Sequence, residues 1–285
     1  MTTAARRGSA VTIPFEVLSE SGGLPAYDLP AALATIYGGT LGFTAPRLYA
    51  NFVSSVDGVV SLGHEHPSSG GAISGGSLAD RFVMGLLRAC ADAVLIGAGT
   101  LRGSPGHVWT PGHVYPPGAD HFTELRHHHL GRSLDPVLCV VTASGDLDAT
   151  HPGLRAGSVI LTGDAGAKRM RGRLPDGVVV RSLGDLSPLP IELVLDAVHD
   201  QAGEVVLTEG GPRLIGELLG ANLLDELFLT LSPVLFGRSA ADLRQGLVDG
   251  VGFAGGAAPQ LEIQSVRRHG SYLFLRYRVR SQAER

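Results

Sequence analysis

Two short glycine-rich segments could hold a phosphate-bearing ligand in this chain of 285 residues. Residues 97–100 follow one apolar run, and residues 209–211 follow another. A glycine lets a ligand approach the backbone more closely than a Cβ would allow. Pro212 suits the first turn of a helix, whose free N–H groups and dipole attract an anion. Together the segments predict one site for an extended cofactor, although each alone also fits an ordinary strand-to-helix connection.

A polar turn at residues 54–58 could supply the reacting end of such a site. Asp57 is the carboxylate of this turn, and Asn51, Ser54 and Ser55 lie shortly before it. The alternation of side chains over 47–54 predicts a strand that leads into the turn. Taken alone, Asp57 followed by Gly58 fits a tight turn at least as well as a binding site.

The elements that must position these residues follow from runs of apolar residues and from the turn residues between them. After the first strand, Ser77 is expected to cap a helix that leads into the strand before Gly97. Residues 63–76 are expected to form a flap, and 102–130 a long loop with a helix over 119–130. Further strands are expected at 11–18, 136–142, 158–162, 177–182, 205–208, 225–236 and 261–280, and further helices at 28–37, 190–201 and 212–219.

Strands that alternate with helices, followed by a strand-rich tail, predict an α/β fold. We expect a mostly parallel central sheet with antiparallel C-terminal strands and helices on both faces. Residues 1–45 are expected to form an N-terminal extension, and 46–285 the main domain.

The composition limits the classes of function. A net charge of -4 argues against a nucleic-acid partner, and we find no apolar run long enough to cross a membrane. Cys90 and Cys139 lie in apolar surroundings, and no apolar signal segment follows Arg6, so a reducing, cytoplasmic location is expected. No metal site is expected, because the adjacent histidines at 127–129 would point in different directions on a helix.

Five segments in matching order resemble the reductase domain of the bifunctional riboflavin-biosynthesis deaminase/reductase. They are Ser-Ser-Val-Asp-Gly at 54–58, Leu-Leu-Arg-Ala at 86–89, residues 92–100, Thr-Glu-Gly-Gly-Pro-Arg-Leu at 208–214, and residues 224–237. The resemblance covers residues 47–280 and includes stand-alone reductases of the actinobacterial type. It implies a dihydrofolate-reductase-like fold and an NADPH-dependent reductase that transfers hydride to a pyrimidine-type substrate.

The same resemblance implies roles for individual residues. The first glycine-rich segment would hold the cofactor with Gly97, Gly99 and Thr100, and the second with Glu209, Gly210 and Gly211. In folds of this type the second segment usually contains a cis peptide, so a cis Gly210–Gly211 bond is expected. Three polar residues after strands could bind the adenosine ribose or its phosphate, although plain turn formation is the favoured explanation when they are taken alone; these are Thr142, Ser144 and Thr162.

On the substrate side, the resemblance makes Asp57 the catalytic acid that orients the carbon receiving hydride. Asn51, Ser54, Ser55 and Arg88 would contact the substrate. In related sequences an acidic pair and a downstream basic residue follow the first glycine-rich segment and help to bind the substrate phosphate. This chain lacks them, so Arg102 or His107 would have to substitute.

The expected substrate is 5-amino-6-(5-phosphoribosylamino)uracil, an intermediate of riboflavin biosynthesis. Two alternatives remain: reduction of dihydrofolate or another pterin-like heterocycle, and a non-catalytic nucleotide-binding protein. The chain lacks the zinc-binding motifs of a deaminase. The resemblance also implies a homodimer, with the strands near 226–235 as a possible contact.

Overall fold

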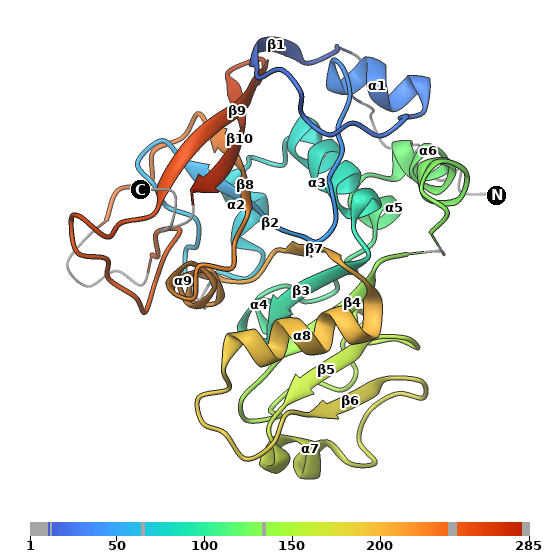
Figure 1. Ribbon diagram of the computed structural model, residues 1–285, viewed down its shortest axis with the longest axis vertical. Coiled ribbons are helices and arrows are strands. Elements are labelled where there is room, and N and C mark those ends of the chain that lie inside the picture. The colour runs from blue at the N-terminus through green and yellow to red at the C-terminus, as the bar shows by residue number, and fades with distance from the viewer. Residues whose placement is uncertain (1–10, 12, 64–65, 133–134, 239–243, 281–285) are drawn as a thin grey trace, which may run out of the picture.

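The computed structural model describes residues 11, 13–63, 66–132, 135–238 and 244–280. Within these ranges, ten strands form one sheet in the order β1-β9-β10-β8-β2-β7-β3-β4-β5-β6 (Figure 1). The strands are β1 Glu16–Glu20, β2 Arg47–Ser55, β3 Ala93–Gly97, β4 Val137–Val141, β5 Val159–Thr162, β6 Val179–Ser182, β7 Val205–Thr208, β8 Glu226–Ser232, β9 Gln260–His269 and β10 Tyr272–Arg280.

The sheet changes direction at β8. All neighbours from β8 to β6 run parallel, whereas β8, β10, β9 and β1 pair antiparallel. The predicted α/β class, with a mostly parallel sheet and antiparallel C-terminal strands, is therefore confirmed.

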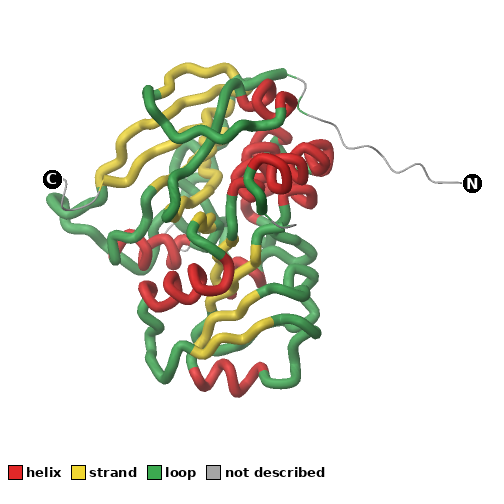
Figure 2. Tube along the Cα trace, turned by 45° about the vertical axis from the view of Figure 1, so that its right-hand side comes forward, coloured by secondary structure: helices red, strands yellow, loops and turns green. Residues whose placement is uncertain are grey.

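Helices cover both faces of the sheet, as predicted (Figures 1 and 2). Side chains alternate along β3, so Val94 and Ile96 face one core while Ala93 and Leu95 face the other. The first core contains α1 (Ala31–Tyr37), α3 (Leu78–Cys90), α5 (Pro111–Val114), α6 (Ala119–Glu124) and Met170 of α7 (Asp164–Met170). The second contains α8 (Ile191–Ala202) and α9 (Pro212–Gly220).

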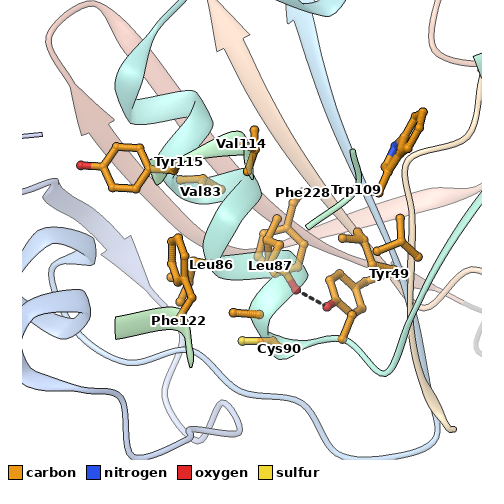
Figure 3. Packing of buried hydrophobic residues seen from close by; sticks show 14 of the residues in the cluster. Tyr49, Val83, Leu86, Leu87, Cys90, Trp109, Val114, Tyr115, Phe122 and Phe228 are labelled. Atoms are coloured by element: carbon orange, nitrogen blue, oxygen red, sulfur yellow. Dashed lines mark hydrogen bonds between the residues drawn. The ribbon is translucent and has the colours of Figure 1, made fainter. Parts of the chain in front are cut away.

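Helix α3 contacts the parallel strands β2 and β7 and also the helices of the segment between β3 and β4. Ser77 caps it as predicted, because its side chain accepts a hydrogen bond from the Asp80 amide. At its other end, the Tyr49 hydroxyl of β2 donates to the Leu87 carbonyl at 2.7 Å (Figure 3). This bond fixes the C-terminal turn of α3, next to Arg88, against β2.

The N-terminal segment joins the sheet through β1 and covers the first core. The Arg267 guanidinium lies 4.0 Å from the Tyr37 ring centroid and donates to the Tyr37 carbonyl at 2.9 Å. The first strand starts later than expected, at Glu16. Asp28 does not cap the first helix, since its carboxylate lies 3.3 Å from His129 Nδ1 and the helix starts after Pro30.

The long segment between β3 and β4 is more ordered than a loop. It contains α4 (Ala98–Arg102), α5, the short 3₁₀-helix η1 (Pro116–Gly118), α6 and the π-helical turn η2 (Leu125–His129). The predicted flap contains α2 (Ser69–Ile73). Among the described residues, no helix combines the length and the apolar character needed to cross a bilayer.

Candidate active site

A cleft of about 1320 Å³ opens at the carboxyl ends of the central parallel strands. Ligands of open α/β sheets usually bind at this edge, outside the ends of the strands. Both glycine-rich segments line the cleft: residues 97–100 after β3 and residues 209–211 after β7. The two segments that were predicted to share one ligand therefore face the same space.

Hydrogen bonds join β3, just before the first segment, to the start of the second segment. The Leu95 carbonyl of β3 accepts from the Glu209 amide at 3.2 Å and from the Thr208 hydroxyl at 3.1 Å. The Thr208 hydroxyl also accepts from the Gly210 amide at 3.2 Å. A Cβ built on Gly211 would lie 3.5 Å from Thr100 Oγ1, in ordinary contact. The cis peptide expected at Gly210–Gly211 does not occur, because the cis bonds of the described residues are Ala45–Pro46 and Ser187–Pro188.

The glycines of these segments differ in how much space surrounds the position of a Cβ atom. A Cβ on Gly97 or Gly99 would have no protein atom within 4 Å. A Cβ on Gly210 would lie 2.4 Å from Leu214 Cδ2 of α9. Gly210 is therefore explained by packing within the protein. Gly97 and Gly99 leave open space over a backbone that lines the cleft, as a closely approaching cofactor would require.

Arg88 is one of the residues behind the cleft wall, and all of its donors are used inside the protein. It is fully buried, and its Nη2 lies 2.6 Å from Glu209 Oε2. Its Nε donates to the same carboxylate at 3.0 Å, and its Nη1 donates to the Val108 and Thr110 carbonyls at 3.4 Å. Its remaining contact is Nη2 to His107 Nε2 at 2.9 Å. Arg88 therefore positions the second glycine-rich segment and the 107–110 segment.

Aromatic and imidazole rings form the wall beside Arg88. The His107 ring centroid lies 4.9 Å from that of Trp109 and 5.1 Å from that of His113, both in edge-to-face geometry. Burial, followed by the charge of Arg88, lowers the pKa of His107 to about 3. His107 is therefore neutral at physiological pH. It lines the cleft as predicted, but it cannot supply the positive charge of the missing phosphate-binding residue.

Asp80 is a carboxylate in the cleft that sequence reasoning missed. It projects from α3, is 4% exposed and accepts a hydrogen bond from the Thr230 side chain of β8. Burial raises the pKa of Asp80 to about 6, and the Glu209 charge acts in the same direction. A buried acid that titrates near neutrality can receive or share a proton with a ligand. In the sequence, Asp80 is explained equally well as a helix-capping acid in the first turn.

Asp57 lies elsewhere, at the exposed turn beyond β2, and is not among the residues that line the cleft. Its carboxylate accepts from the Ser55 hydroxyl at 2.5 Å and from the amides of Phe236 and Gly237. The bond from Ser55 is the main reason that the pKa of Asp57 falls to about 2. These bonds join the turn that carries Asp57 to the segment after β8. The catalytic role of Asp57 stays a prediction.

Of the remaining predicted residues, some line the cleft and others lie outside it. Ser54 and Ser55 lie outside the cleft lining and bond locally, whereas Asn51 lines it. Thr142 and Ser144 line the cleft, and their hydroxyls also accept turn amides, from Gly145 and Asp146. Thr162 is fully buried beneath α7, and its hydroxyl has no partner.

Arg102 lines the part of the cleft next to this turn. Its Nη1 donates to the Asp146 carbonyl at 3.2 Å, which places the guanidinium beside the 142–146 turn. The sequence had suggested Arg102 as a substrate residue; the structure places it at the edge where the cofactor ribose was expected. Which group it binds stays a prediction.

In the described ranges, no three His, Cys, Asp or Glu side chains gather as they would around a metal ion. Of the three adjacent histidines, His129 contacts Asp28. Cys90 and Cys139 are both buried and free.

Comparison with known proteins gives a family match. The family model of the RibD C-terminal domain matches residues 46–275. No curated protein sequence matches the chain closely enough to count as a relative.

Several solved structures share the fold. A pyrimidine reductase-like protein from Corynebacterium diphtheriae has 21% identity and a TM-score of 0.65, with 90% of this chain and 96% of that one covered. RibD from Acinetobacter baumannii has 19% identity and a TM-score of 0.59, and the match covers 87% of this chain but 60% of that protein. The riboflavin biosynthesis reductase Rib7 of Saccharomyces cerevisiae has 13% identity and a TM-score of 0.54, with 88% of this chain and 95% of that one covered.

The family match runs from the start of β2 into the first part of β10, and it includes both glycine-rich segments. The resemblance seen in the sequence is thereby confirmed. The chain belongs to the RibD C-terminal domain family, the reductase family of riboflavin biosynthesis.

Proposed function

We propose that this protein is an NADPH-dependent reductase that transfers hydride to a pyrimidine-type heterocycle. One observation carries the proposal: the Leu95 carbonyl of β3 accepts a hydrogen bond from the Glu209 amide, and the segments that follow β3 and β7 both line a single cleft large enough for a dinucleotide and a second ligand. The open backbone at Gly97 and Gly99 fits the close approach of a cofactor. The family match supports the same class of reaction.

When bound, NADPH supplies the hydride, and the protein brings donor and acceptor together. The cofactor-binding residues would lie along the floor of the cleft, from Thr142 and Ser144 through Gly97, Gly99 and Thr100 to Glu209, Gly210 and Gly211. Arg102 lies at the Ser144 end and would pair with a phosphate on the adenosine ribose.

The substrate would occupy the other end of the cleft, between Asn51, Asp80 and the ring wall of His107, Trp109 and His113. A buried carboxylate suits the adjacent N–H groups that an aminopyrimidine presents. Trp109 and His113 add apolar ring surface next to the heterocycle. The substrate to test first is 5-amino-6-(5-phosphoribosylamino)uracil, and dihydrofolate is the alternative within the same chemistry.

Cofactor titration separates the reductase from a non-catalytic protein. We expect NADPH to bind more tightly than NADH in isothermal titration calorimetry, and NADPH oxidation to follow addition of substrate. Arg102→Ala should reduce the preference for NADPH by about tenfold, which is the loss of about 1.4 kcal/mol. Arg155→Ala is the matched control, since Arg155 is exposed and pairs with Asp135. Failure to bind either nucleotide would reject both reductase alternatives.

A pair of carboxylate variants decides which acid acts on the substrate. Asp80→Ala should raise the KM for the heterocycle or lower kcat, while NADPH affinity is retained. Asp57→Ala should preserve NADPH affinity, and from its place outside the cleft we expect it to keep turnover within about tenfold. Loss of hydride transfer only in Asp57→Ala would instead support the role that the sequence suggested.

A further inference from the structure

We infer that His107 presents a fixed N–H donor to the substrate and thereby selects a neutral oxygen acceptor at this point of the cleft. The inference rests on the proposed function only for the identity of the substrate. The donor itself follows from the hydrogen bonds of the ring.

The partner of Nε2 determines the tautomer of His107. Arg88 Nη2 lies 2.9 Å from His107 Nε2, and an arginine guanidinium has donors but no acceptor. Nε2 must therefore hold a lone pair, and in the neutral ring the proton lies on Nδ1. The other contacts of Arg88, with Glu209 and with two main-chain carbonyls, prevent the guanidinium from turning away.

The Nδ1–H group is left open to the cleft. It has no hydrogen-bond partner among the described residues, and it is not one of the buried polar atoms without a partner. His107 also lines the cleft next to Trp109 and His113. An N–H in this position can be satisfied by a ligand oxygen, either a carbonyl of the heterocycle or a hydroxyl of its side chain.

The surroundings keep the ring neutral over the physiological range. Arg88 and Arg81 from α3, His113 from α5 and His151 from the segment after β4 all act against protonation, together with burial. A protonated Nε2 would also face the Arg88 guanidinium. A neutral donor lacks the charge that strengthens a bond to phosphate, so it suits a carbonyl or hydroxyl oxygen.

This assignment differs from the role expected from the sequence, in which His107 would replace a basic residue for the substrate phosphate. Here the Nδ1–H group of His107 donates a hydrogen bond to a neutral oxygen of the substrate. Arg88 is then a positioning residue, because it acts on the substrate through His107.

The tautomer can be measured in the protein without any cofactor or catalytic step. Two-dimensional ¹⁵N–¹H spectra of the histidine side chains, assigned with His107→Gln, should show His107 with a protonated Nδ1 and an unprotonated Nε2 from pH 5 to pH 8. A ring that is protonated on Nε2, or that titrates in this range, would overturn the inference. This result is independent of whether the protein is a reductase.

Ligand binding tests the selection. Uridine and uridine 5′-monophosphate are the probes, with the His107 ¹⁵N shifts and calorimetry as readouts. We expect both probes to shift Nδ1, and His107→Leu to weaken both about equally, by about tenfold. His107→Gln, which can accept from Arg88 and still offer an N–H group, should recover part of the affinity. If neither probe shifts Nδ1, or if His107→Leu weakens only the phosphorylated probe, the inference is wrong.

Discussion

Residues of the cleft fall into two groups: those whose type is explained by contacts within the protein, and those whose type is not. Gly210 and Arg88 are required by their protein neighbours, since Leu214 fills the space beside one and Glu209 neutralises the other. Gly97 and Gly99 have no comparable explanation in packing. Where contacts within the protein do not explain a residue type, we expect that the residue contacts a ligand.

Alanine substitutions of the glycines separate these two reasons. Gly99→Ala should leave the midpoint of thermal unfolding nearly unchanged, because the new Cβ meets no protein atom, yet weaken NADPH binding by about tenfold or more. Gly210→Ala should destabilise the fold by about 1–3 kcal/mol, because its Cβ would overlap Leu214. Calorimetry and thermal unfolding measure the two effects. Unchanged NADPH affinity in Gly99→Ala would contradict our assignment of the segment.

The raised pKa of Asp80 predicts a pH dependence in both binding and stability. An ionised carboxylate accepts from substrate N–H groups, so the KM for the heterocycle should fall as pH rises through about 6. The folded-state pKa lies above the unfolded value, so this group makes the protein less stable as pH rises from 5 to 8, by about 1 kcal/mol. Glu209, Arg81 and Thr230 are the groups that face it.

Asp80→Asn should remove both dependences. Steady-state kinetics and urea unfolding at pH 5 and pH 8 provide the measurements. A KM that keeps its dependence on pH in the variant would show that another group titrates.

At the scale of elements, the site depends on how α3 is joined to the segment after β7. The Arg88–Glu209 pair connects positions 121 residues apart in the chain. Sequence patterns identified each element separately, and Ser77, the strands and the glycine-rich turns were predicted from local signals. Such signals do not reveal which charges from distant elements meet, so the pairing of Arg88 with Glu209 and the burial of Asp80 were missed.

The segment between β3 and β4 was harder to predict for a related reason. Its helices are short, with four residues in α5 and six in α6, and they are held by packing of Phe122 and Tyr115 against Phe82 of α3. Helices of this length have little intrinsic stability. Tertiary contacts therefore decide the structure of the wall that carries His107 and Trp109.

Removing the arginine of the buried pair tests this connection. Arg88 and Glu209 have side-chain exposures of 0% and 8%, so Arg88→Ala leaves a buried carboxylate unpaired and should cost about 3–5 kcal/mol of unfolding free energy. The exposed Arg155–Asp135 pair is the control, where Arg155→Ala should cost at most about 1 kcal/mol. Equal losses in urea unfolding would show that the buried pair does not hold the two elements together.

At the scale of the whole molecule, the antiparallel end of the sheet carries, on one face, a row of apolar side chains that the second core covers only in part. Cross-strand neighbours on this face are Phe52 with Leu229, Leu229 with Leu275, and Tyr277 with Ile263. Ile263 remains 47% exposed and Leu261 43% exposed. An apolar surface of this kind often marks a contact with another protein chain. It includes β8, the strand that the sequence suggested for a dimer contact.

We propose that two copies of the chain pack through this face. Sedimentation velocity should show a dimer, and Ile263→Arg should shift it toward the monomer because a charge would be buried in the contact. Leu193→Arg is the matched control, since Leu193 is 40% exposed on α8. A monomer in the unmodified protein would reject the proposal.

The central claim is that the segments after β3 and β7 bind one dinucleotide and present it to a substrate beside Asp80 and His107. A crystal structure of the protein with bound NADPH tests it most directly. We predict that the cofactor lies across Gly97, Gly99 and Gly211, with its nicotinamide facing the Asp80 end of the cleft. NADPH bound at another surface, or with its nicotinamide directed away from Asp80 and His107, would contradict the account.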